Sequence, residues 1–292
     1  MEWLNRLMAL DRRWIFLLVA IGTALPIIFP IGFKVSVTPP AKALFDRIEQ
    51  MGPDDVVLLS FDYGPSTAPE NDPMADAVLR HCFSKRVKVV LLSLFPIGGV
   101  TMADQSLARV LRDFPDIRRG IDYAHLGYKS GSQATMKQMG EDIHRVFPTD
   151  RYGMALSEVP LLQRVRTYDD MKLVVSFATG IIGEWWANLI NAQFHIPVAV
   201  GCTAVSAPKY YAYLQSGQMV GLLGGLKGAS EYERLVIDRY PIVEAAYTRA
   251  GLYTAIKGMD AQTIIHTLIL LFIIMANVAF FAGRGRAAQA KR

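Results

Sequence analysis

Two uncharged, mostly apolar runs near the ends of the 292-residue chain limit its possible folds more than any other feature. They cover Trp14–Ile31 and Ile264–Phe281, each about 18 residues, close to the roughly 20 that a helix needs to cross a bilayer. Mean hydropathy is +0.24, too low for a protein made mainly of membrane helices. The sequence therefore predicts two membrane spans around one long, less apolar segment.

Each run has an alternative interpretation. The first run follows Arg12 and Arg13, as the core of a cleaved signal peptide would. It is longer than a usual signal-peptide core and lacks a small-x-small cleavage site, so we expect an uncleaved anchor. The second run contains His266 and Asn277, which could be functional groups inside the membrane. Alternatively, His266 lies near the interface and Asn277 forms a hydrogen bond between helices.

The basic residues are concentrated in the tails. The formal net charge of +5 equals the charge of the two tails, and the segment between them contains equal numbers of basic and acidic residues. A neutral central domain offers no electrostatic surface for phosphate backbones, so we expect no nucleic-acid partner. By the positive-inside rule, both termini lie in the cytoplasm and the central domain outside it.

The predicted organisation follows from these spans. It comprises a cytoplasmic tail (1–13), a membrane helix (14–32), an α/β domain (33–262), a second membrane helix (263–282) and a basic cytoplasmic tail (283–292). The predicted location is the cell membrane, and the lipid bilayer is the first predicted partner.

Within the central domain, apolar runs of strand length alternate with helical stretches. The runs are rich in Val, Leu and Ile on both faces, which is typical of strands in a covered parallel sheet. The predicted fold is a mostly parallel, doubly wound (Rossmann-like) α/β sheet. Its predicted strands are Val56–Phe61, Val87–Leu94, Ile121–Leu126, Leu173–Ala178 and Val198–Val200. Its predicted helices are Ala41–Gln50, Pro73–Ser84 with Asp72 as N-cap, Met102–Asp113, Ser132–Val146, Glu184–Gln193, Ser206–Gln215 and Ala229–Arg249; 148–167 is predicted to be irregular.

Polar residues gather where the predicted strands end. In open parallel sheets the ligand crevice lies beyond the carboxyl ends of the strands. The crevice candidates are Asp62, Lys129, Thr179, Glu184 and Thr203. Asp62 directly follows an apolar strand, and a carboxylate at the rim of a crevice could bind a ligand or act as a base. Alternatively, glycines and hydroxyls serve the turns themselves, and Asp62 caps its own turn.

The sequence does not indicate a reaction. It lacks G-x-S-x-G, G-x-x-x-x-G-K-[ST] and a G-x-G-x-x-G after the first strand. The histidines are dispersed, and Cys82 and Cys202 match neither a metal motif nor a disulfide framework. We therefore assign no catalytic residue, metal or cofactor.

The segment Gly217–Ala229 is rich in glycine among apolar residues. Gly221, Gly224 and Gly225 are candidates for a subunit contact, and a buried last strand is the alternative. The layout of span, α/β domain and span is similar to that of auxiliary subunits of membrane transport or motility complexes, without a shared motif. The favoured hypothesis is a non-enzymatic, membrane-anchored subunit that assembles with itself or other membrane proteins. The alternative is an extracytoplasmic hydrolase-like enzyme or small-ligand receptor that uses the crevice.

Overall fold

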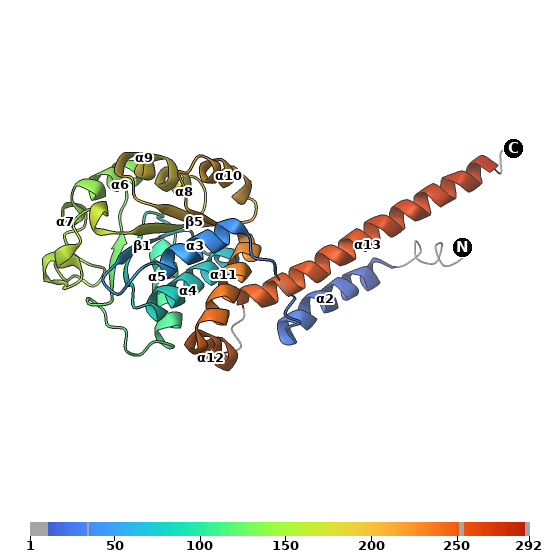
Figure 1. Cartoon of the computed structure of the whole chain (residues 1–292). Coiled ribbons are helices and arrows are strands. Elements are labelled where there is room, and N and C mark those ends of the chain that lie inside the picture. Colours follow the sequence, from blue (N-terminus) through green and yellow to red (C-terminus); the bar gives the residue numbers. More distant parts are fainter. Residues whose placement is uncertain (1–10, 34, 251–253, 290–292) are drawn as a thin grey trace. The chain divides into compact units, whose positions relative to one another are not determined.

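The computed structural model describes residues 11–33, 35–250 and 254–289 (Figure 1). The chain divides into two compact units. One is the α/β domain, Val35–Ala255; the other combines both ends of the chain, Met1–Lys34 and Ile256–Arg292.

The α/β domain is built on a six-stranded sheet in which every pair of neighbours is parallel. The strands are β1 (Val56–Asp62), β2 (Lys88–Ser93), β3 (Tyr123–Tyr128), β4 (Leu173–Ala178), β5 (Val198–Cys202) and β6 (Gly221–Gly224). Their spatial order is β3-β2-β1-β4-β5-β6. The predicted parallel α/β sheet is confirmed, including four adjacent strands in the order β2-β1-β4-β5.

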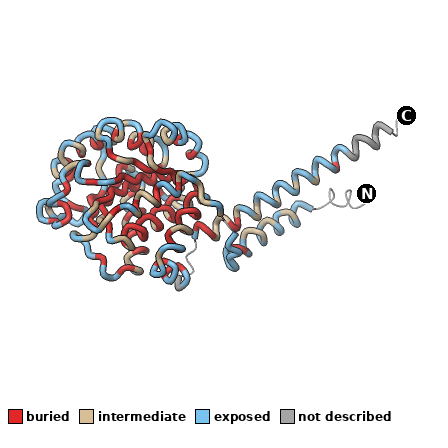
Figure 2. The backbone as a smooth tube through the Cα atoms, viewed as in Figure 1, coloured by how far each residue is buried: buried red, intermediate tan, exposed pale blue. Residues whose placement is uncertain are grey.

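Helices cover both faces of the sheet, which is why the strands are apolar on both sides. One face carries α3 (Pro39–Glu49), α4 (Ala68–Ser84), α5 (Gly99–Leu111) and α11 (Gly225–Arg239). The other carries α6 (Ser132–Glu141), α7 (Ile143–Val146), α8 (Ile182–Trp185), a π turn (Trp186–Ile190), α9 (Asn191–Phe194) and α10 (Ala207–Gln215). Buried residues are concentrated in the sheet and on the helix faces that pack against it (Figure 2).

Several predicted helices have different bounds. The helix predicted from Pro73 begins at Ala68, so Asp72 lies inside α4 and is not its N-cap. Pro69 occupies the first turn, where a missing N–H is tolerated. Pro73 lies inside the helix, where it removes one backbone hydrogen-bond donor. The predicted helix Ala229–Arg249 is divided into α11 and α12 (Pro241–Ala250) at a proline, and Ser132–Val146 is divided into α6 and α7. The predicted irregular excursion contains two short 3-10 turns, Leu156–Glu158 and Leu162–Arg164, and a third, Tyr168–Asp170, follows it.

The glycine-rich segment forms the edge strand β6 and the start of α11, as the alternative interpretation held. Gly221 packs on α3 so closely that an added Cβ would lie 2.7 Å from Leu44 Cβ. Gly225 has a left-handed φ of +63° and lies against Ala204. These glycines permit close packing inside the domain, so their geometry gives no support to a subunit contact.

The terminal unit contains α2 (Arg12–Ile28) and α13 (Thr254–Gln289). By length and composition, α13 could cross a membrane, and Thr254–Phe281 has a mean hydropathy of 2.5 in its most apolar window. It is the one helix with this property among the described residues. At 1.5 Å per residue, the 17 residues of α2 rise about 25 Å, short of the roughly 30 Å hydrocarbon core. The prediction of two spans is therefore supported for the second span alone.

The residues that follow α2 are tied to Asp260 of α13. Its buried carboxylate accepts hydrogen bonds from the backbone N–H groups of Ile31, Gly32 and Phe33 at 2.9, 2.8 and 3.0 Å. A carboxylate that receives three backbone donors fixes the chain that follows α2 against the first turns of α13.

Candidate functional site

The strand order reverses between β1 and β4, which makes their carboxyl ends the topological switch point of the sheet. The two loops that leave these strands meet there. Thr67 Oγ1 and Thr179 Oγ1 are 2.7 Å apart, so one hydroxyl donates to the other across the switch point. Thr67 precedes the first residue of α4, and Thr179 directly follows β4.

Asp62 lies beneath this switch point and not at its rim. Its side chain is fully buried, contrary to the expectation of an exposed rim carboxylate. Oδ1 accepts a hydrogen bond from Leu94 N at 2.9 Å, and Oδ2 accepts from Ser176 Oγ at 2.9 Å and Trp186 Nε1 at 3.1 Å. Because side chains alternate along a strand, Asp62 shares the face of Val56 and Leu58, which belong to the core under α6–α10.

The donor furthest from Asp62 in the sequence comes from the π turn. It lies between α8 and α9, and its first residue, Trp186, is fully buried with its indole N–H on Asp62. Burial raises the pKa of the Asp62 carboxyl, and the hydrogen bonds it accepts oppose that rise. Asp62 thus joins β1, β2, β4 and the π turn, so its observed contacts are structural.

The other crevice candidates do not converge on one point. Glu184 pairs with Lys209 at 2.6 Å and accepts from Tyr213 OH at 3.3 Å. Thr203 donates to Ser206 Oγ at 3.2 Å within its own turn. Lys129 follows β3, which is separated from β4 by two strands. The structure brings Thr179 together with Thr67 and places the remaining candidates in separate contacts.

Polar contacts join the neighbouring loops at this edge of the sheet. Lys209 Nζ donates to Gly180 O at 2.7 Å, and Glu70 Oε2 accepts from Ala204 N at 2.8 Å. Together with the Thr67–Thr179 bond, these contacts connect the loops after β1, β4 and β5. Of the residues predicted to hold a ligand, Thr179 is thus engaged in holding these loops to one another.

Loops at this edge of the sheet also expose aliphatic side chains. Ile97, in the loop after β2, is 70% exposed; Ile181, after β4, is 52% exposed; and Val205, after β5, is 91% exposed. We call these three residues the loop crest. Exposed aliphatic residues grouped on neighbouring loops are a feature of protein contact surfaces.

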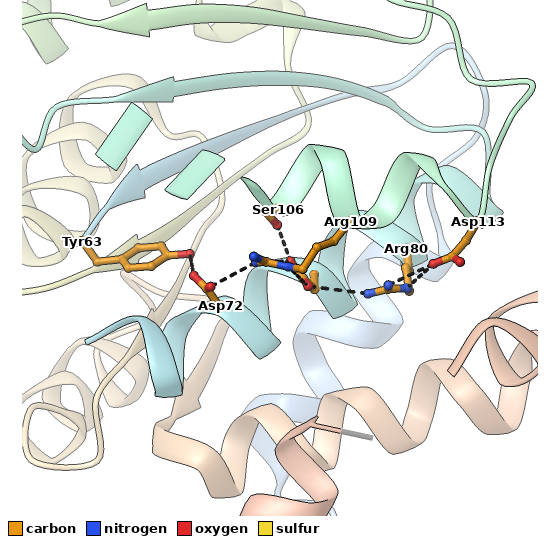
Figure 3. Close-up of polar contacts among 7 residues, drawn as sticks. Tyr63, Asp72, Arg80, Ser106, Arg109 and Asp113 are labelled. Carbon is orange, nitrogen blue, oxygen red and sulfur yellow. Dashed lines mark hydrogen bonds and ion pairs between the residues drawn. The ribbon is translucent and has the colours of Figure 1, made fainter. Parts of the chain in front are cut away.

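A second cluster, between α4 and α5, was not predicted from the sequence (Figure 3). Arg109 Nε and Nη2 donate to Asp76 at 2.7 and 3.0 Å, and Nη2 lies 3.1 Å from Asp72. Arg80, nearly fully buried, binds Asp113 through Nε and Nη2 at 3.1 and 2.9 Å. Its guanidinium lies 4.7 Å from the ring centroid of Tyr247.

This charged network continues from α4 to the carboxyl end of β1. Tyr63 directly follows β1 and donates its hydroxyl to Asp72 Oδ1 at 2.6 Å. Burial raises the pKa of the Tyr63 hydroxyl well above its usual value, and the neighbouring Asp72 carboxylate raises it further. Burial also raises the pKa of Asp72. A cavity of about 200 Å³ lies beside the network, lined by Asp72, Pro73, Asp76, Arg80, Arg109, Glu233, Tyr247 and Thr254.

The spacing of charges contains a signal for this network. Asp72, Asp76 and Arg80 recur every four residues, and so do Arg109 and Asp113 on the next helix. Residues four apart lie on one helix face. Two such charged stripes on consecutive helices of a covered sheet indicate that the helices pair through their charges.

Within the described part of the chain, no group of three or more His, Cys, Asp or Glu side chains is arranged to hold a metal ion. Neither a protein-family model, nor a curated protein, nor a solved structure matches the sequence or fold of this chain. Function therefore has to be inferred from the residues themselves.

Proposed function

We propose that this protein is a non-enzymatic, membrane-anchored subunit whose α/β domain binds another protein through the loop crest. The observation that carries the proposal is the division of roles at the carboxyl edge of the sheet. There the polar side chains connect the loops, as Thr67 does with Thr179, while Ile97, Ile181 and Val205 project into solvent.

The energetics favour contact with a partner. Burial of apolar surface contributes about 25 cal/mol per Å², and removing an exposed Val or Ile side chain from water contributes about 1.5–3 kcal/mol. Three such residues on loops that are already braced lose little conformational freedom on binding, which reduces the entropic cost of association.

The proposed anchor consists of both terminal helices. α13 has the length and composition of a span. The apolar run that contains α2 continues beyond the end of the helix to Ile31, and most of its large side chains are exposed, among them Trp14, Phe16 and Phe29. We propose that α2 crosses with its flanking residues in the interface, that both termini are cytoplasmic and that the domain is extracytoplasmic, as the basic tails favour.

The test is the mass and composition of the native complex after extraction in mild detergent. The wild-type chain is expected in an assembly larger than can be explained by copies of itself, and Ile97→Ser, Ile181→Ser and Val205→Ser together are expected to release the other subunit. Ile121→Ser, at the amino edge of the sheet and 37% exposed, is the matched control and is expected to keep it. A crest variant that retains its partner would refute the proposal.

The crevice provides a second candidate function, a small-ligand receptor. It is favoured by the meeting of Thr67 and Thr179 at the switch point, where doubly wound sheets bind ligands. Under this alternative, Thr67→Val together with Thr179→Val abolishes binding of the small ligand and leaves the complex formed through the loop crest intact.

A further inference from the structure

Asn277 is a polar residue within the apolar part of α13. Its side chain is exposed, and its Nδ2 atom donates to the Ile273 carbonyl at 2.9 Å within the same helix. Among the described residues, none donates to its Oδ1 atom, which leaves the carboxamide with an acceptor to satisfy. By contrast, Thr263 and Thr267 donate their hydroxyls to backbone carbonyls one turn earlier in α13.

The α2 helix covers a different face of α13. A Cβ atom added to Gly22 of α2 would lie 3.2 Å from Ile264 Cγ2 and 3.0 Å from Leu268 Cδ1, so these side chains form the α2–α13 contact. At about 100° per residue, Asn277 lies roughly 180° around the helix from Leu268. The carboxamide therefore points away from α2.

The depth of Asn277 makes this exposure significant. The first charged residue after it is Arg284, about 10 Å further along the helix axis. If α13 spans the bilayer, as proposed above, Asn277 lies inside the hydrocarbon region, where polar side chains normally face other helices.

We propose that two copies of this chain form a parallel dimer in the membrane through the Asn277 face of α13. The inference rests on the proposed membrane insertion and identifies one partner as a second copy. A carboxamide has both a donor and an acceptor, so two Asn277 side chains related by a two-fold axis bind each other reciprocally. Buried asparagine pairs specify register and partner number in parallel helix pairs in the same way.

Large apolar side chains share this face of α13. Ile273, Ile274, Phe280 and Phe281 lie three or four positions from Asn277 and are each more than half exposed, so they surround the amide pair in the proposed dimer. The dimer contact is separate from the loop crest, so the crest is free to bind a different subunit.

The test uses the full-length chain reconstituted in phosphatidylcholine liposomes at decreasing protein-to-lipid ratio, with dimerisation measured by energy transfer between labelled copies. Alkaline carbonate extraction is performed first, and release of the wild-type chain from the vesicles would refute the membrane anchor itself. If the chain remains inserted, the dimer proposal is tested alone.

Asn277→Leu is expected to weaken dimerisation about tenfold, since each interhelical side-chain bond contributes a factor of a few to roughly twentyfold. Asn277→Gln keeps the amide and is expected to stay within about threefold of wild type. Thr267→Val is the matched control because it removes a polar group that is satisfied within its own helix, and we expect no change. Equal dimerisation of Asn277→Leu and wild type, or a wild-type chain that is monomeric at every dilution, would overturn the proposal.

Disulfide trapping adds a geometric readout. Asn277→Cys is expected to cross-link to a second copy on mild oxidation, while Ile264→Cys, which faces α2, is expected not to. The native thiols do not interfere, because Cys82 and Cys202 are buried and burial raises the pKa of each to about 12. Cross-linking at position 264 and not at 277 would contradict the assigned face.

Discussion

Replacing Asp62 by Ala distinguishes a structural carboxylate from a ligand-binding one. The change removes the acceptor for three buried donors: the Leu94 backbone N–H, the Ser176 hydroxyl and the Trp186 indole N–H. Each buried donor left without a partner costs about 1–3 kcal/mol. The change also removes a carboxylate whose burial is unfavourable. We therefore expect a net destabilisation of about 3 kcal/mol, at the lower end of the summed cost of three unpaired donors.

The assay is urea unfolding of the full-length chain in mild detergent, followed by far-UV circular dichroism. Trp186→Phe removes one donor and is expected to cost about 2 kcal/mol, the range for a hydrogen bond to a charged group. The control is Ser66→Ala, in the exposed loop after the same strand, which is expected to stay within about 0.5 kcal/mol of wild type. A loss below about 1 kcal/mol for Asp62→Ala would refute the structural role and favour a ligand-binding one.

Four further outcomes are expected. Arg80→Met leaves the Asp113 carboxylate without its buried partner and is expected to cost about 3–5 kcal/mol in urea unfolding, a prediction that fails if stability is unchanged. Burial lowers the pKa of His81 to about 4, below its value of about 6.5 when unfolded, so the neutral ring stabilises the fold above about pH 6.5. That contribution is lost as the pH falls toward 4, and His81→Gln is expected to flatten the pH dependence of the urea midpoint. Asp260→Ala is expected to speed hydrogen exchange of the Ile31–Phe33 amides about tenfold; unchanged exchange would contradict the role of the carboxylate as their acceptor. Gly221→Val is expected to cost about 1–3 kcal/mol by overpacking against Leu44 and to leave the mass of the complex unchanged, whereas loss of the complex without loss of stability would restore the subunit-contact hypothesis.

The sheet was predictable because its strands are hydrophobic on both faces. Val56–Phe61 and Leu173–Ala178 consist mainly of Val, Leu, Phe and Ala, a composition typical of strands covered by helices on both sides. Their parallel pairing follows from the helical stretches between them. The edge strand β6 could not be assigned from the sequence, because glycines that pack closely inside the domain, Gly221 on α3 and Gly224 on α10, would equally serve a subunit contact.

The contacts of Asp62 depend on tertiary structure. Alternation along β1 places its side chain on the face of Leu58, but the sequence does not show that a π turn brings Trp186 over that face. A π turn inserts one residue into a helix without a recognised sequence signal, so the indole position was not predictable. The charged stripes of α4 and α5 were visible in the sequence, but their pairing required knowledge of how the two helices pack.

The most direct test of the proposed function is site-specific photo-cross-linking in intact membranes, with a photoreactive amino acid introduced at Val205 of the loop crest. Val205 is 91% exposed, so the substitution leaves the core unchanged. The proposed contact predicts one discrete adduct at Val205 that is absent when the same amino acid replaces Ile121 at the amino edge of the sheet. No adduct at Val205, or the same adduct at both positions, would contradict the loop crest as the surface through which this protein binds its partner.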